Sequence, residues 1–270
     1  MFHTFDTKDF DRNMVYHKQK KSLGQHFLKD HNIARKIVRS ISPGPKNILE
    51  VGPGKGILTR FLVERESTTL KLVEIDKNYV DFLKEKYPAE PEIIHKDFLK
   101  MELRDTFKEK FTVIGNFPYH ISSQIFFKIL ENRDKINEIV GMIQKEVAVR
   151  ITSPHGNKHY GILSVLLQTF YDIELLFAVN PTVFEPPPKV RSAVIRLKRN
   201  RTDKLPCHEP LFVKVVKTSF NQRRKMLRNS LKSIFPETDF SGTIFQKRPE
   251  QLSINDFVNL SVFIDTNRNH

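Results

Sequence analysis

The most unusual stretch of the sequence is Gly115-Asn116-Phe117-Pro118-Tyr119, which directly follows the apolar run 111–114. The Asn116 side chain offers both a hydrogen-bond acceptor and a donor group, and Pro118 fixes the backbone beside it. Tyr119 adds a flat ring that can stack on another flat group. Asn and Pro are also common turn residues, and Tyr119 could belong to the core. Taken alone, the stretch fits a plain turn equally well.

A second group of candidate residues lies earlier in the chain, beginning with Gly52-Pro53-Gly54-Lys55-Gly56 after the predicted strand 47–51. Glycines between a strand and a helix let a ligand approach the backbone, and no Gly-Lys-Ser/Thr of a Walker loop follows them. Glu74 ends the next strand, where a carboxylate can accept hydrogen bonds from both hydroxyls of a ribose. Asp97 follows the strand after that and could meet an adenine amine. Each feature also fits a tight turn, a solvated acid or a helix cap.

Strands and helices alternate along this part of the chain. The predicted strands are 47–51, 70–74, 92–95, 111–114, 139–143, 173–179 and 192–197. The predicted helices are 33–41, capped by Asp30, then 57–65, 78–87, 125–130 and one after Gly161. This alternation predicts a parallel sheet covered on both faces. The glycine turn, Glu74, Asp97 and Asn116 would then lie at one edge of that sheet.

This arrangement resembles the class I S-adenosylmethionine-dependent methyltransferases, and Asn116 to Tyr119 resemble the motif of those that methylate planar amino nitrogens. The resemblance implies an α/β, Rossmann-like fold and S-adenosylmethionine as the cofactor. The Asn116 side-chain carbonyl and a backbone carbonyl near Pro118 would each accept one adenine N6 hydrogen, which favours a tetrahedral nitrogen. Tyr119 would stack on the extruded base, and no strong general base is required.

Further stretches narrow the resemblance to one family. They are Lys21 to Leu28, Gln144 to Val147, Tyr160-Gly161, Phe184 to Val190 and Phe220 to Asn229. With these, residues 20–263 are similar to the ribosomal RNA adenine dimethyltransferases. The resemblance implies dimethylation of N6 of two adjacent adenosines in the 3′-terminal hairpin loop of 16S rRNA, within the 30S precursor. It also implies a role in small-subunit biogenesis.

The same resemblance assigns site residues. The implied cofactor contacts are His26, Leu28, Gly52, Glu74, Asp97 and Asn116. The implied catalytic residues are Asn116, Pro118, Tyr119 and Phe184, with Phe184 packing on the base opposite Tyr119. The implied RNA contacts are Arg223, Arg224, Lys225 and Arg228, placed on a helix beside a linker.

Several of these assignments have structural alternatives. Many relatives carry Asn at position 26 and Leu at position 117, so His26 and Phe117 depart from the family pattern. His26 could be a packing residue that leads into a helix, and Phe184 could be a core phenylalanine. The arginines and lysine near residue 224 could form a merely solvated basic face.

The resemblance and the residue pattern together divide the chain into three parts. We expect residues 1–20 to be a basic, flexible extension, residues 21–198 to be the S-adenosylmethionine-binding catalytic domain, and residues 199–270 to be a helical RNA-substrate domain. The polar run 198–204 is the linker. In the last part, apolar spacing predicts helices, and Ser253 with Asp256 resembles a capping box.

The composition favours a polyanionic partner, because 45 Lys+Arg against 31 Asp+Glu give a net charge of +14. An anionic membrane surface would be favoured equally by charge alone. The single cysteine, Cys207, excludes an internal disulfide and a cysteine-clustered zinc site, so no metal is expected. No apolar run reaches the ~20 residues of a membrane helix, and residues 1–21 lack a secretory signal. We expect a cytoplasmic monomer.

Three other functions compete with 16S rRNA dimethylation. One is the related 23S rRNA adenine methylation, against which residues 220–229 argue. Another is an assembly factor that binds pre-30S particles and for which catalysis is secondary. DNA adenine methylation is disfavoured, because the sequence shows no target-recognition domain beyond the helical tail.

Overall fold

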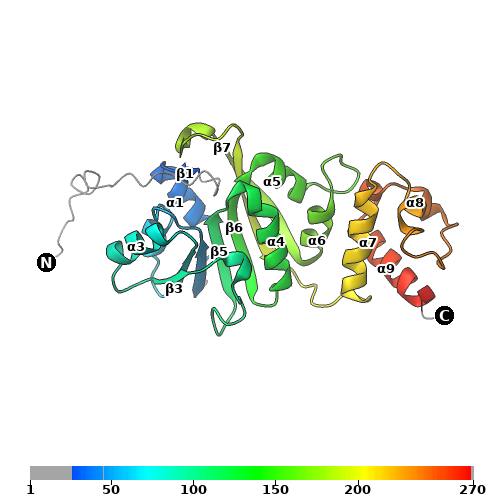
Figure 1. Cartoon of the computed structure of the whole chain (residues 1–270), viewed down its shortest axis with the longest axis horizontal. Coiled ribbons are helices and arrows are strands. Elements are labelled where there is room, and N and C mark those ends of the chain that lie inside the picture. The colour runs from blue at the N-terminus through cyan, green and yellow to red at the C-terminus, as the bar shows by residue number, and fades with distance from the viewer. Residues whose placement is uncertain (1–25, 45, 269–270) are drawn as a thin grey trace.

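Alternating apolar strands and helices build a sheet of seven strands in the computed structural model, which describes residues 26–44 and 46–268 (Figure 1). The strand order is β4-β3-β2-β5-β6-β9-β7. The strands are β2 (Asn47–Val51), β3 (Thr69–Glu74), β4 (Glu92–His95), β5 (Phe111–Asn116), β6 (Ile136–Gln144), β7 (Tyr171–Val179) and β9 (Ser192–Arg199). Each lies where the apolar pattern predicts a strand. β5 is longer than predicted and includes Asn116.

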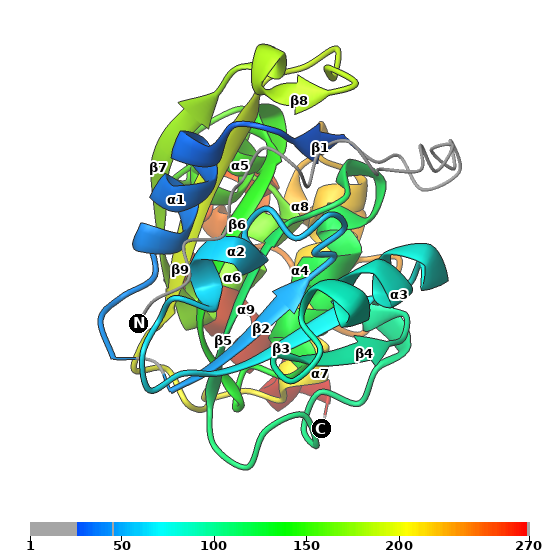
Figure 2. The same ribbon diagram turned by 90° about the vertical axis from the view of Figure 1, so that its left-hand side faces the viewer.

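The two faces of the sheet are covered by different helices (Figure 2). On one face lie α1 (His31–Arg39), α2 (Thr59–Leu62) and α3 (Lys77–Lys86), and on the other lie α4 (Ser122–Glu131), α5 (Lys145–Thr152) and α6 (Ile162–Phe170). Asp30 caps α1 as predicted, since its Oδ1 accepts from the N–H groups of Asn32 and Ile33. The helix predicted over 57–65 is too long, because α2 covers only Thr59–Leu62. Gly56, with a positive φ of 75°, precedes α2 in a run of turns and delays its start.

The sheet is mixed and not wholly parallel as predicted. β4, β3, β2, β5 and β6 are parallel, whereas β9 runs antiparallel to both of its neighbours, β6 and β7. The physical reason is the connection from β7 to β9, which is a loop through the two-residue strand β8 (Phe184–Glu185) and contains no crossover helix. As a result β9 begins at the same edge where the parallel strands end.

The chain after β9 forms a helical tail at the end of the molecule opposite α3 (Figure 1). It contains α7 (Glu209–Asn221), α8 (Leu227–Leu231) and α9 (Ile254–Arg268). The predicted capping box is confirmed, because the Ser253 N–H donates to Asp256 Oδ2 at 2.8 Å and the Asp256 N–H donates to Ser253 Oγ at 3.1 Å. Among the residues in the described ranges, no helix is both long and apolar enough to cross a membrane.

The predicted helical placement of Arg223, Arg224 and Lys225 is wrong. They lie in the turn between α7 and α8, and only Arg228 lies on a helix. The Lys225 N–H donates to the Gln222 carbonyl at 2.8 Å, and Met226 has extended backbone angles, so the helix cannot continue.

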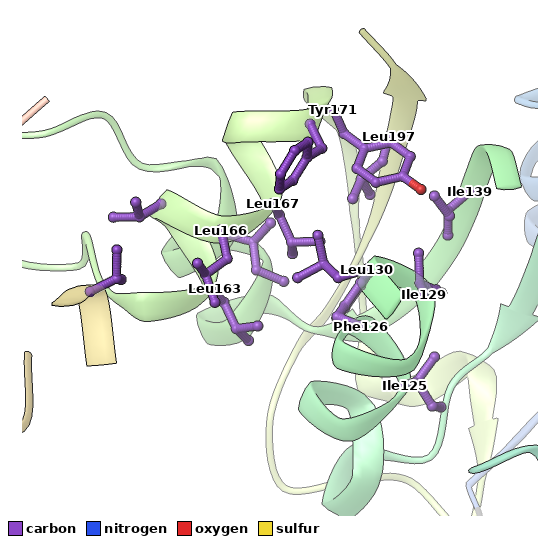
Figure 3. Packing of buried hydrophobic residues seen from close by; sticks show 14 of the residues in the cluster. Ile125, Phe126, Ile129, Leu130, Ile139, Leu163, Leu166, Leu167, Tyr171 and Leu197 are labelled. Atoms are coloured by element: carbon purple, nitrogen blue, oxygen red, sulfur yellow. The ribbon is translucent and has the colours of Figure 1, made fainter. Parts of the chain in front are cut away.

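One apolar cluster runs from the sheet through α4 and α6 into the tail. Figure 3 shows α4 residues such as Phe126 and Leu130 meeting Leu163 and Leu166 of α6, beside Ile139 of the sheet. The proposed division of the chain at residues 198 and 199 stays a prediction. Residues 1–20 and the start of the motif at Lys21 lie outside the described residues.

The departure at Phe117 has a packing explanation. Gly115 of β5 is paired with Gly141 of β6, and the fully buried Phe117 ring lies over both. A Cβ added at Gly141 would lie 2.5 Å from Phe117 Cε2, and one at Gly115 would lie 2.8 Å from Cε1. The ring also contacts Phe126 edge-on, with centroids 6.0 Å apart. The space left by two missing side chains therefore accommodates this large residue.

Gly141→Ala should destabilise the fold by about 1–3 kcal/mol, because the new methyl group overlaps the Phe117 ring in a packed core. The free energy of unfolding from denaturant titration measures this. The matched control is Gly242→Ala, where the added Cβ would lie 3.5 Å from Phe245 and the backbone φ is −62°. If the packing explanation holds, Gly141→Ala with Phe117→Leu is less destabilised than the sum of the single changes; simple additivity contradicts it.

Candidate active site

A cavity of about 290 Å³ opens at the edge of the sheet where the parallel strands end. The wall of this cavity brings together seven of the predicted residues: His26, Gly52, Glu74, Asp97, Asn116, Pro118 and Tyr119. They come from five separate segments of the chain, and the parallel register of β4, β3, β2 and β5 aligns their ends. The predicted common edge is therefore confirmed.

The glycine turn is shaped by Glu74. Gly52 and Gly54 have positive φ values of 66° and 53°. Glu74 Oε2 accepts from the Gly54 N–H at 3.0 Å, and Oε1 accepts from the N–H groups of Ile75 and Asp76, each at 2.9 Å. Burial raises the pKa of Glu74, and these backbone donors oppose the rise. Each carboxylate oxygen still has lone-pair capacity for a further donor, such as a ribose hydroxyl.

Asp97 has both a structural and a cavity-lining position. Its Oδ1 accepts from the Leu99 N–H at 2.9 Å and caps a short 3₁₀ turn (Phe98–Lys100). This is the capping role that the sequence allowed for Asp97 beside ligand binding. The same residue lines the cavity beside Phe98 and Ile75. Ile75 is 50% exposed, which is unusual for a large apolar side chain at a strand end. These apolar walls suit the faces of a flat base.

Sequence reasoning missed several apolar residues of the cavity wall, among them Phe27, Ile75, Phe98 and Leu99. The sequence held a signal for three of them, because apolar residues come immediately after the candidate acids in Glu74-Ile75 and in Asp97-Phe98-Leu99. Phe27 gave no such signal. Its ring lies against the glycine turn, where a Cβ added at Gly54 would be 3.0 Å from Phe27 Cε1.

The Asn116 side chain has a defined orientation. Its Nδ2 donates to the His26 carbonyl at 3.0 Å, so within the described part of the chain the amide donor is engaged and Oδ1 remains an acceptor at the cavity. The Pro118 carbonyl accepts from the Ile121 N–H at 3.2 Å and keeps a second lone pair. Two acceptors are therefore present at the predicted positions.

Tyr119 is half-buried and contacts two distant segments. Its hydroxyl lies 2.5 Å from Ser192 Oγ, and its ring centroid lies 5.4 Å from that of His26. Burial raises the pKa of the Tyr119 phenol, and the bond to Ser192 opposes the rise. His26 Nδ1 in turn lies 2.9 Å from the Pro186 carbonyl, so the imidazole is tied to the loop that follows β8 and begins with three prolines, 186–188.

Leu28 and Phe184 lie outside the cavity wall. They pair across β1 (Phe27–Leu28) and β8, and their exposed fractions are 5% and 1%. Both belong to the apolar cluster under α1 and α2. For Phe184 the core alternative describes its observed position, because the ring is buried and does not face the cavity. The site contacts assigned to these two residues stay predictions.

The basic residues of the tail lie apart from the first cavity. Arg223 lines a second cavity of about 470 Å³ together with Arg150, Lys158 and the Phe220 ring. Arg223 also has structural contacts, since Nε lies 3.7 Å from Glu250 Oε2 and Nη2 donates to the Asn157 carbonyl at 3.4 Å. Arg224, Lys225 and Arg228 are exposed.

Beneath the glycine turn lies a buried acid, Glu50, which sequence reasoning did not single out. It is 1% exposed, and its Oε2 accepts from the Thr59 hydroxyl at 2.6 Å. Burial raises the pKa of Glu50 to about 8; the Thr59 hydrogen bond opposes this rise and the nearby Glu74 carboxylate adds to it. Glu50 therefore carries a proton in the folded protein at neutral pH.

Comparison with known protein families and sequences gives a consistent set of relatives. A family model described as "Ribosomal RNA adenine dimethylase" matches residues 16–265. The chain is 53% identical over 248 residues to "Ribosomal RNA small subunit methyltransferase A" of Cytophaga hutchinsonii, covering 90% of this chain and 96% of the relative. It is 55% identical over 251 residues to the protein of the same name from Bacteroides thetaiotaomicron, covering 90% and 93%.

Two solved structures have a similar fold. A dimethyladenosine transferase from Plasmodium falciparum gives a TM-score of 0.74 at 23% identity, covering 90% of this chain and 98% of that one. The 23S rRNA methyltransferase ErmE gives a TM-score of 0.65 at 26% identity, and the match covers 87% of this chain and 99% of ErmE. Each likeness covers most of this chain, and the predicted α/β, Rossmann-like fold with C-terminal helices is confirmed.

Glu50→Gln should remove a pH dependence of stability. Between pH 4.5 and about 8 the folded wild type keeps a proton on Glu50 that the unfolded chain has lost, so its free energy of unfolding falls as pH rises, by up to about 1.4 kcal/mol per pH unit. The variant lacks this decline. Its stability relative to wild type should therefore increase across that window and level off above pH 8.

Denaturant titrations at pH 5, 6, 7 and 8 measure the difference. Glu85→Gln is the matched control, because it makes the same chemical change on an exposed side chain of α3. If the free energy of unfolding of Glu50→Gln differs from that of wild type by the same amount at every pH from 5 to 8, the prediction is contradicted.

Proposed function

Because the chain belongs to the ribosomal RNA adenine dimethylase family, we propose that it methylates N6 of two adjacent adenosines in 16S rRNA with S-adenosylmethionine as the methyl donor. The observation that carries this proposal is the orientation of Asn116. Its amide donor is held by the His26 carbonyl, which leaves Oδ1 as an acceptor, and the residue lines a cavity together with the glycine turn and Tyr119. We place the adenosines in the 3′-terminal hairpin loop of the RNA.

The residues present fit the cofactor. Gly52, where an added Cβ would meet nothing within 4 Å, leaves the backbone open for a methionine part to approach, and Glu74 offers lone pairs for ribose hydroxyls. Asp97 would accept from the adenine amine of the cofactor, and Ile75 and Phe98, which line the same cavity, would pack on its ring. When bound, S-adenosylmethionine supplies an electrophilic methyl group on a positively charged sulfur.

The protein's own contribution is to orient the target nitrogen. The N6 lone pair of adenine is delocalised into the ring and must be localised before the nitrogen can attack. Asn116 Oδ1 and the Pro118 carbonyl each accept one N6 hydrogen, which favours a tetrahedral nitrogen with its lone pair toward the methyl group. Tyr119 stacks on the extruded base and keeps nitrogen, methyl and sulfur in line.

We propose that the exposed cations of the tail bind the RNA backbone. Arg224, Lys225 and Arg228 extend from the tail into solvent, and Arg223 lines the second cavity with Arg150 and Lys158. Long cations on such a surface neutralise phosphates and release counterions. The substrate we propose is 16S rRNA within the 30S precursor, bound by a monomer in the cytoplasm.

The relatives favour the small-subunit RNA over the large-subunit RNA. The two relatives named above for the small subunit are 53% and 55% identical to this chain, whereas the 23S rRNA methyltransferase ErmE is 26% identical. An assembly role remains a second candidate function. It is supported by the position of Arg224, Lys225 and Arg228 outside the first cavity, which lets particle binding and methyl transfer be separated.

Incubation with labelled S-adenosylmethionine and 30S particles from an unmethylated strain should yield dimethyladenosine. Asn116→Ala should reduce the rate by about 10²–10³, because one of the two acceptors that orient the nitrogen is lost. Its particle binding should stay at the wild-type level. Methylation of naked 23S rRNA but not of 30S particles would sink the proposed substrate, and full growth rescue by Asn116→Ala would favour the assembly role.

Arg224→Ala with Lys225→Ala should weaken particle binding and make it less sensitive to salt. Each lost phosphate contact should reduce the slope of log affinity against log salt by roughly 0.7–0.9. The matched control is Lys108→Ala with Lys110→Ala, which removes the same charge from exposed positions before β5, at the opposite edge of the sheet. An equal loss of affinity in both double variants would indicate only a general charge effect.

A further inference from the structure

Ser192 is far from Tyr119 in sequence, but the fold brings the two residues into contact. It is the first residue of β9, paired with Gln144 of β6 and Val179 of β7, and it is fully buried. Because β9 runs antiparallel to its neighbours, its first residue lies at the edge where the parallel strands end. The cavity opens at that same edge.

The Ser192 hydroxyl contacts the proposed base-stacking residue directly. Ser192 Oγ and the Tyr119 hydroxyl are 2.5 Å apart, and within the described ranges this is the side-chain hydrogen bond that each hydroxyl makes. The Tyr119 backbone is held separately, since its carbonyl accepts from the Ser122 hydroxyl at 3.1 Å. The bond to Ser192 therefore acts on the orientation of the ring and leaves the backbone turn to other contacts.

The opposite part of the Tyr119 side chain meets His26. Their ring centroids are 5.4 Å apart with a tilt of 35°, and His26 Nδ1 is tied to the Pro186 carbonyl at 2.9 Å. The phenol group is thus fixed by β9 and the ring by the segment that leads into β1. A tyrosine ring with two free torsions would otherwise take several orientations at the cavity.

We propose that Ser192 is a positioning residue for methyl transfer, which orients the Tyr119 ring so that its face receives the target adenine. The proposal rests on the proposed function, because it takes Tyr119 to be the stacking platform. A ring that pivots moves the stacked base, and a displacement of about 1 Å from the attack geometry can cost about 10² in rate. The role differs from cofactor binding, since Ser192 is not part of the cavity wall.

The test compares Ser192→Ala, Tyr119→Phe and the double variant in single-turnover methylation of 30S particles. Each single change should slow the transfer step by about 10- to 100-fold. The double variant should be no slower than the worse single variant, because both remove the same hydrogen bond. Affinities for S-adenosylmethionine and for the particle should stay within about twofold of wild type.

The matched control is Tyr171→Phe. That phenol is also buried, and it donates to the Ile136 carbonyl at 3.1 Å, within the sheet and away from the cavity. This variant should lower the melting temperature and leave the transfer rate unchanged. Ser192→Ala should show the reverse pattern, with a slower transfer step and a melting temperature close to wild type.

Three outcomes overturn the role of Ser192: a wild-type transfer rate in Ser192→Ala, rate losses that multiply in the double variant, or a rate loss matched by lost cofactor affinity. Failure of the proposed substrate has a different signature, namely wild-type protein that methylates 23S rRNA and not 30S particles. The transfer rate of Ser192→Ala relative to wild type is then measured on 23S rRNA, and it still decides whether Ser192 is a positioning residue. A wild type inactive on both RNAs overturns both proposals.

Discussion

The turn that carries Asn116 and Tyr119 keeps its shape because the Phe117 ring is buried over two glycines paired across β5 and β6. Phe117 is fully buried, whereas Asn116, Pro118 and Tyr119 are each partly exposed at the end of the strand. The Phe117 N–H donates to the Met142 carbonyl at 3.0 Å, which extends the pairing of β5 and β6 one residue past Asn116. Packing and backbone pairing thus fix the turn that carries the Asn116 and Tyr119 side chains.

Contacts from distant parts of the chain complete the site. The His26 carbonyl orients the Asn116 amide, and the His26 ring and Ser192 hold Tyr119 from two sides. At the other part of the cavity wall, Glu74 ties the glycine turn to the end of β3 through Gly54. Each of these bonds joins a strand end to a segment brought there by the sheet. The site is therefore a property of the sheet edge and not of any single motif.

The helical tail is physically continuous with the catalytic part. A single apolar cluster includes Phe126 of α4, Leu166 of α6 and Phe212 of α7. Such a shared core fixes the tail relative to the sheet, because its buried side chains would lose packing contacts on separation. The exposed Arg224 and Lys225 then hold a set position relative to the cavity. This geometry suits a substrate that reaches both regions at once.

Periodicity and strand-end residues determined two features of this protein from sequence alone: the strands near their observed bounds, and the common edge of Glu74, Asp97 and Asn116. The family came from the resemblance of longer motifs, such as residues 220–229, to known proteins. Local signals suffice for the first two features, because alternating apolar runs and parallel register follow from the chain itself. Only the tertiary structure decided the rest. The antiparallel course of β9, the contact of Ser192 with Tyr119, the burial of Phe184 and the space that admits Phe117 depend on residues far apart in sequence, whose packing no local pattern records.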